Sequence, residues 1–278
     1  VGICAGICLA GKRPIMSIQS SGLGNMMNAI MSLTSLYGFP LPILASWRGV
    51  ENETIPAQIP FNAGIEGMLR NYGIPSLAVR SADDIDGIHA AVKEAFDNST
   101  ASVILITPSV WGEPPPQTVD FPPRRTGSSL LYERDLPEPK LSRLDAIRAI
   151  VSSADEETAI VSNIGVPSKE TFACGDRPLN FYMLGSYTQA TPIGLGIALS
   201  SSGKVIVIDG DGSLLGSSVL PVMASESPDN LAVFCLDNGT FGSTGNQITP
   251  AYAVSDLELA AKAFGIKDTR TVHTSEEI

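Results

Sequence analysis

Short apolar runs alternate with helical patterns along the first part of the chain. Strand-length apolar runs are expected at 14–19, 42–46, 77–79 and 103–107. Between them, apolar residues recur at helical spacing over 24–36, 62–72 and 82–96. The last helix opens with Asp83 and Asp84, as the helix dipole favours. This alternation predicts a parallel sheet covered by helices.

The same alternation returns in the second half of the chain. Strands are expected at 159–162, 181–184, 204–209 and 231–236. Helices are expected at 141–153, 169–173, 192–201, 217–226 and 256–264. Pro221 is tolerable only if its helix begins near Ser217 or Ser218, because proline breaks a helix interior.

A proline-rich stretch separates the two halves. Its prolines follow no apolar period and lie at 114, 115, 116, 122, 123, 137 and 139. Prolines at this density form an extended, semi-rigid connector. We therefore predict an α/β protein with two domains, 1–111 and 141–278, joined by a linker over 112–140.

Composition limits the partners and the chemistry. With 44% hydrophobic and 17% charged residues the chain is globular, and its net charge of −11 argues against nucleic acid as a partner. No apolar stretch reaches the roughly 18 residues of a membrane span, and no basic leader is present, so we expect a cytoplasmic protein. Two histidines cannot build a multi-histidine metal site, and four cysteines without C-x-x-C spacing read as reduced thiols.

The strongest chemical signal lies where two neighbouring strands end. The run 204–209 leads into Gly210-Asp211-Gly212-Ser213, and the next strand leads into Asn238. The carboxyl ends of parallel strands share one edge of a sheet, where α/β proteins bind ligands. Asp211 and Asn238 could there converge on Mg²⁺, while the glycines let a phosphate approach the backbone. Alternatively, both segments are ordinary turns.

The pairing of Gly210-Asp211-Gly212 with Asn238 resembles the signature of thiamine diphosphate enzymes. The resemblance implies that the side chains of Asp211 and Asn238 and the carbonyl of Thr240 hold Mg²⁺, which clamps the diphosphate beside Gly210, Gly212 and Ser213. The segment NFYMLGS (180–186) looks like the part that contacts the aminopyrimidine ring. Gly185, Ser186 and Tyr187 are therefore further cofactor-binding candidates.

The N-terminal half resembles the pyrimidine-binding domain of decarboxylases that act on short anionic 2-oxoacids. The matching segments are VGICAG (1–6), QSSGLGN (19–25), SWRG (46–49) and PAQ (56–58). Among these enzymes the chain is most similar to sulfopyruvate decarboxylases with both subunit types fused, and next to phosphonopyruvate decarboxylases. The resemblance implies conversion of 3-sulfopyruvate to sulfoacetaldehyde and CO₂, and a homodimer or larger assembly with the site between subunits.

Two departures from this family accompany the resemblance. The family's catalytic glutamate is expected just before Val1, so we read the chain as a fragment that lacks it. Tyr187-Thr188 also stands where the family usually has Met-Gly. A non-catalytic cofactor-binding homologue and a generic nucleotide-binding α/β protein remain the alternatives.

Three residues are candidate catalytic residues on the substrate side. Arg48 is the candidate contact for the anionic substrate, with a structural ion pair to Glu51 or Glu53 as the alternative. Asn25 is expected to contact cofactor or substrate, or else to cap a helix. Gln58 is a similar candidate, or else an exposed loop amide. We expect His89 to be solvated, and the methionine-rich helix 24–36 to be a core helix or a subunit interface.

Overall fold

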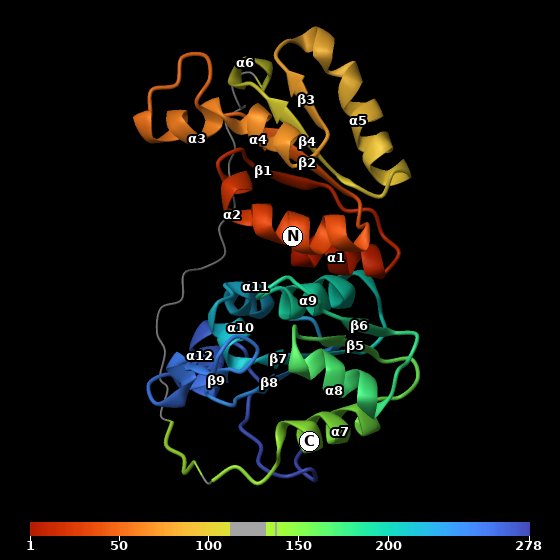
Figure 1. Ribbon diagram of the computed structural model, residues 1–278, viewed down its shortest axis with the longest axis vertical. Helices are drawn as coiled ribbons and strands as arrows, with labels where there is room; N and C mark the ends of the chain where they lie inside the picture. The colour runs from red at the N-terminus through yellow and green to blue at the C-terminus, as the bar shows by residue number, and fades with distance from the viewer. Residues whose placement is uncertain (112–131, 137) are drawn as a thin grey trace.

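The first half of the chain forms a four-stranded parallel sheet. The computed structural model describes residues 1–111, 132–136 and 138–278 (Figure 1). The strands lie in the order β1-β2-β4-β3. Their bounds are Met16–Gln19 for β1, Leu41–Ser46 for β2, Ser76–Val79 for β3 and Ala101–Ile106 for β4. All four predicted strands are therefore confirmed, within a few residues at their ends.

Helices cover this first sheet. They are α1 (Gly2–Leu9), α2 (Gly22–Ala29), the 3-10 helix Pro56–Gln58, α3 (Ile59–Ala63), α4 (Ile65–Asn71), the 3-10 turn Ala82–Asp84, α5 (Asp86–Asp97) and α6 (Pro108–Trp111). The helix predicted over 24–36 begins earlier and runs on from α2 into the π-helical segment Ile30–Ser35. The single helix predicted over 62–72 is wrong, because the chain breaks at Gly64 between α3 and α4.

The second half repeats the arrangement. Its parallel sheet has the order β6-β5-β7-β8. The strands are β5 (Ala159–Ser162), β6 (Asn180–Tyr182), β7 (Val205–Gly210) and β8 (Leu231–Leu236), followed by the hairpin β9 (Thr240–Phe241) and β10 (Gln247–Ile248). The helices are α7 (Arg143–Ser153), α8 (Val166–Cys174), α9 (Ala190–Ser200), α10 (Asp211–Leu215), α11 (Val219–Glu226), the 3-10 turn Pro250–Tyr252 and α12 (Leu257–Phe264). Pro221 is the third residue of α11, within its first turn, as expected.

Two parallel four-stranded sheets covered by helices confirm the predicted α/β class. The domain limits stay a prediction, since most of the linker predicted over 112–140 lies outside the described residues. None of the helices in the described part of the chain has the length and apolar character that a bilayer span requires.

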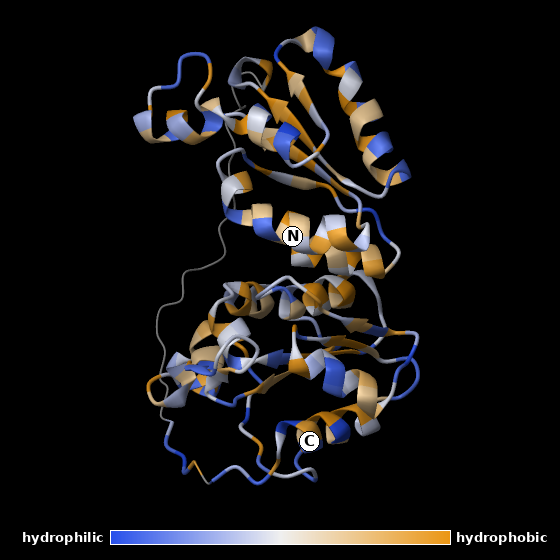
Figure 2. Ribbon diagram, viewed as in Figure 1, coloured by the Kyte–Doolittle hydropathy of each residue, from blue (hydrophilic) through white to orange (hydrophobic). Residues whose placement is uncertain are grey.

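The two halves meet through α1 and α9. A Cβ added to Gly6 would lie 2.1 Å from the carbonyl oxygen of Ile193, and one added to Gly196 would lie 2.0 Å from that of Ile3. Glycine at both positions lets the helix backbones touch. Figure 2 shows hydrophobic residues on both helices at this junction, where Ala5 of α1 shares a buried cluster with Ile193 of α9.

The carboxyl edges of both sheets open toward the same side of the molecule. In Figure 1 the helices that follow a strand end there, α2 after β1 and α10 after β7, both lie on the left.

Candidate functional site

Strand register brings Asp211 and Asn238 to one edge of the second sheet. Gly210 at the end of β7 pairs with Leu236 at the end of β8. Asp211 and Asp237 follow these partners directly, and Asn238 comes one residue later. The convergence predicted from the two strand ends is therefore present in the backbone.

The two side chains differ in their surroundings. Asp211 is only 2% exposed and accepts a hydrogen bond from the hydroxyl of Thr249. Asn238 is exposed, and its Oδ1 accepts a hydrogen bond from the backbone N–H of Thr240 at 3.2 Å. Burial raises the pKa of Asp237, and the nearby negative charge of Asp211 raises it further. A cation at this edge would relieve that repulsion.

A second buried carboxylate, that of Asp209, links the Gly-Asp-Gly turn to a neighbouring helix. Asp209 is fully buried, accepts a hydrogen bond from the hydroxyl of Thr191 on α9, and accepts another from the Gly210 N–H at 2.9 Å. Burial raises the pKa of Asp209. The turn is thus tied to the helix that packs against α1.

Buried polar atoms without partners gather at the same edge. Asn163 Oδ1 follows β5, Ser186 Oγ follows β6, and Ser213 Oγ lies in α10 after β7. Ser213 lies near the Asp209 carboxylate but makes no hydrogen bond of normal geometry there. Since buried polar groups are nearly always hydrogen-bonded in native proteins, these atoms indicate a polar ligand.

Tyr187 lies against the turn. Its hydroxyl donates a hydrogen bond to the carbonyl oxygen of Gly212 at 2.7 Å, and a Cβ on Gly216 would lie 2.4 Å from that hydroxyl oxygen. A Cβ on Gly212 would lie 2.2 Å from the Phe241 ring, whose centroid is 6.4 Å from that of Tyr187. Burial, Asp209 and Asp211 together raise the pKa of Tyr187. Two neighbouring aromatic rings thus pack against the backbone between Gly212 and Gly216.

On the first sheet, Arg48 is occupied by an ion pair. Its Nε and Nη2 donate to the two carboxylate oxygens of Glu53 at 2.7 and 2.8 Å. Glu53 also accepts from the backbone N–H groups of Ile55 and Gly49. The hydrogen bond from Arg48, followed by these backbone bonds, lowers the pKa of Glu53 to about 2. The ion-pair alternative for Arg48 is therefore confirmed, with Glu53 and not Glu51 as the partner.

The alternatives weighed for Asn25 and Gln58 are both wrong. Asn25 is the fourth residue of α2 and is exposed, so it cannot cap a helix whose N-cap is Ser21. Gln58 is half-buried in the 3-10 helix Pro56–Gln58, and its Oε1 accepts from the hydroxyl of Ser21 at 2.5 Å. Neither residue has a structural role of the kind expected, and contact with substrate or cofactor stays a prediction for both.

Comparison with known proteins agrees with this geometry. Residues 169–278 match the family model for the C-terminal TPP binding domain of thiamine pyrophosphate enzymes. A sulfopyruvate decarboxylase of Methanosarcina acetivorans is 44% identical over 100% of this chain and 74% of its own length. The beta subunit of sulfopyruvate decarboxylase from Methanocaldococcus jannaschii is 48% identical over 49% of this chain and 72% of that subunit. A phosphonopyruvate decarboxylase of Streptomyces hygroscopicus is 32% identical over 98% of this chain and 68% of that protein.

The chain belongs to the thiamine diphosphate-dependent decarboxylase family. The family's cofactor fits the residues found at the edge of the second sheet. The unpartnered hydroxyls of Ser186 and Ser213 can donate to phosphate oxygens, whereas Asn163 Oδ1 is an acceptor and would need a bridging water. Across the described residues, no three His, Cys, Asp or Glu side chains cluster to bind a metal, so a cation here would need ligand oxygens from elsewhere, as a diphosphate provides.

Some features of this decarboxylase site were not predicted from the sequence. Asp209, Thr191 and Thr249 were missed, although an aspartate at the end of a buried strand is itself a signal. The helix that follows the Gly-Asp-Gly turn, α10, has only 5 residues.

The remaining sequence predictions concern residues away from this edge. Met27 of the methionine-rich helix is buried in the core of the first sheet, which supports the core interpretation. His89 is exposed on α5, as predicted. The four cysteines are free thiols, although each is only partly buried.

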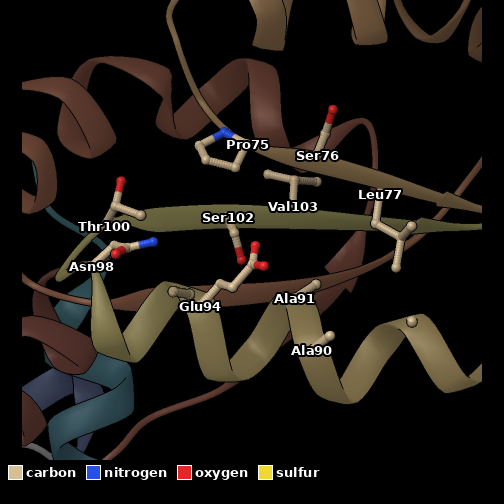
Figure 3. A pocket seen from close by; sticks show the side chains of 12 residues that line it. Pro75, Ser76, Leu77, Ala90, Ala91, Glu94, Asn98, Thr100, Ser102 and Val103 are labelled. Atoms are coloured by element: carbon tan, nitrogen blue, oxygen red, sulfur yellow. The ribbon is translucent and has the colours of Figure 1, made fainter.

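One hollow in the first half of the chain is separate from the candidate site. A cavity of about 250 Å³ lies between α5 and the amino ends of β3 and β4, lined by residues such as Leu77, Glu94 and Ser102 (Figure 3). It contains none of the predicted site residues.

Proposed function

We propose that this protein catalyses the non-oxidative decarboxylation of 3-sulfopyruvate to sulfoacetaldehyde and CO₂, with thiamine diphosphate and Mg²⁺. The observation that carries the proposal is the paired strand ends of β7 and β8, which place Asp211 beside the turn that holds Asn238. The 44% identity to a sulfopyruvate decarboxylase supports this choice of substrate.

The proposed roles follow from the chemistry of each group. Asp211 and Asn238 offer side-chain oxygens, and Thr240 its carbonyl, to Mg²⁺. Gly210, Gly212 and Ser213 receive the diphosphate, while Gly185, Ser186 and Tyr187 lie toward the aminopyrimidine. The bound cofactor supplies the electron sink that a 2-oxoacid needs to lose CO₂. The chain itself binds, orients and keeps water from the reacting groups.

We further propose that the functional unit is a homodimer or larger assembly with the site between subunits, as the resemblance implies. The first half of the chain would act as the pyrimidine-binding domain and the second as the diphosphate-binding domain. The carboxyl edges of the two sheets face the same side of the molecule, which supports these two roles.

The test uses the full-length protein with thiamine diphosphate and Mg²⁺. We expect CO₂ release from sulfopyruvate, detected with a coupled assay, and loss of Mg²⁺-dependent cofactor binding in Asp211→Ala. The matched control is Asp229→Ala, an exposed aspartate at the opposite end of β8. Cofactor binding without CO₂ release from any 2-oxoacid would favour the non-catalytic homologue.

Phosphonopyruvate is the second substrate to examine, because a phosphonopyruvate decarboxylase is 32% identical over 98% of the chain. Release of CO₂ from phosphonopyruvate, with none from sulfopyruvate, would move the assignment to that substrate.

A further inference from the structure

A closed polar network lies at the carboxyl edge of the first sheet. Ser20 and Ser21 follow β1, Arg48 follows β2, and Gln58 and Asn62 come from the 3-10 helix and α3. Ser20 is 0% and Asn62 1% exposed, so this is a built structure and not a chance contact of surface side chains. Its hydrogen bonds determine which atoms remain free.

The direction of every hydrogen bond in the network can be deduced. One amide atom of Asn62 lies 2.6 Å from the carbonyl oxygen of Gln58, which only accepts, so that atom is Nδ2. Asn62 Oδ1 therefore faces Ser20, whose hydroxyl donates to it at 2.5 Å. In turn, Ser20 Oγ accepts from the backbone N–H of Arg48 at 2.9 Å.

The second hydrogen on Asn62 Nδ2 continues the chain of donors. It points to Ser21 Oγ at 3.1 Å, so the Ser21 hydroxyl accepts there. The same hydroxyl donates to Gln58 Oε1 at 2.5 Å. The Gln58 Nε2 group is thereby turned away from the network with both of its N–H donors available.

The positive charge of Arg48 is already neutralised. Arg48 is paired at both Nε and Nη2 with Glu53, whose side chain is 8% exposed. Hence the group that the network presents to a ligand is a neutral amide donor. A neutral donor suits a sulfonate, a weakly basic group with one negative charge, better than a phosphonate, which approaches two charges near neutral pH.

We propose that Gln58 is a specificity residue whose amide N–H groups bind the sulfonate end of the substrate, and that Ser21 and Asn62 are positioning residues that orient this amide. This inference rests on the proposed function, because it assumes that the first sheet faces the substrate. The Gln58 amide would thereby distinguish a substrate with a sulfonate group from a 2-oxoacid without one.

The experiment compares two 2-oxoacids on the full-length holoenzyme. We expect Gln58→Met to raise KM for sulfopyruvate about ten- to hundredfold, the effect of losing a hydrogen bond to a charged group. For pyruvate, which has no sulfonate, kcat/KM should change by less than about threefold. Ser21→Ala keeps Gln58 but removes the hydroxyl that orients its amide, so it should raise KM for sulfopyruvate by a smaller factor. The control is Asn71→Met, on an exposed amide side chain at the end of α4.

A binding measurement separates this inference from the proposed function. Isothermal titration of the holoenzyme with 3-sulfopropionate, an unreactive dianion, should show binding that Gln58→Met weakens about tenfold or more. An equal change in kcat/KM for both 2-oxoacids, or unchanged binding of 3-sulfopropionate, overturns the role of Gln58. Absence of sulfopyruvate turnover, with binding that still depends on Gln58, overturns the proposed reaction and leaves the sulfonate site standing.

Discussion

The hydroxyl of Tyr187 donates a hydrogen bond to the carbonyl oxygen of Gly212, at 2.7 Å. This bond joins the segment after β6 to the turn after β7, the two segments that we propose bind the cofactor. A methionine, which the family resemblance leads us to expect at this position, has no hydroxyl to make such a bond.

Tyr187→Phe should therefore weaken binding of thiamine diphosphate with Mg²⁺. The ring stays, but the Gly212 carbonyl loses its donor, and the loss of one hydrogen bond, about 0.5–1.5 kcal/mol, predicts a dissociation constant raised a few-fold. Titration calorimetry measures it. Tyr72→Phe, on an exposed tyrosine after α4, is the control. Unchanged affinity would mean that the bond does not shape the cofactor site.

Thr249→Val removes the donor to the buried Asp211 carboxylate. Without cofactor we expect a loss of about 1–3 kcal/mol in the free energy of unfolding, because a buried acceptor is left unpaired. Added Mg²⁺ and thiamine diphosphate should recover part of this loss by pairing Asp211 with a cation. Denaturant unfolding with and without the ligands checks it, with Thr274→Val as the control. A loss that the ligands do not change would argue against Asp211 as a metal ligand.

Gly6→Ala should separate α1 from α9. The new methyl group would lie 2.1 Å from the Ile193 carbonyl oxygen, so the helices must move apart. Such overpacking costs about 1–3 kcal/mol. Gly67→Ala is the matched control inside α4, because its methyl group would meet nothing within 4 Å. The control should be neutral or gain up to about 1 kcal/mol from helix propensity. Equal melting temperatures for the two variants would contradict this packing.

The contribution of Glu53 should disappear in acid. Its pKa is lowered from 4.5 to about 2, chiefly by the hydrogen bond from Arg48. A carboxyl whose pKa is depressed on folding stabilises the protein above its unfolded pKa, and that stability is lost as the pH falls through the folded value. The difference in melting temperature between wild type and Glu53→Gln should therefore be constant above pH 4.5 and shrink toward pH 2.

The control for this pH series is Glu226→Gln, on an exposed glutamate at the end of α11. It should show no comparable pH dependence. If the difference in melting temperature between wild type and Glu53→Gln stayed unchanged near pH 2, Glu53 would stabilise the protein through packing and not through its charge.

Local pattern was enough to predict the eight strands of the two parallel sheets and the position of Gly210-Asp211-Gly212 at a strand end. Apolar runs such as 231–236 are long enough to be strands and too short for helices, so their length predicts a strand. The pattern predicted helix ends less well, as the break at Gly64 between α3 and α4 shows. Apolar residues keep a helical spacing across this break, so the spacing alone does not reveal it.

The sequence by itself determined the strands of the two sheets, the positions of the candidate site motifs and the family resemblance. Each of these depends on residues that are close together in the chain. Only the tertiary structure decided that Arg48 pairs with Glu53, that Thr249 reaches Asp211, and that Tyr187 holds Gly212. These hydrogen bonds cross loops whose conformation no local periodicity specifies. The same is true of Gln58, whose free donor is known only once the bonds to Ser21 and Asn62 are traced through space.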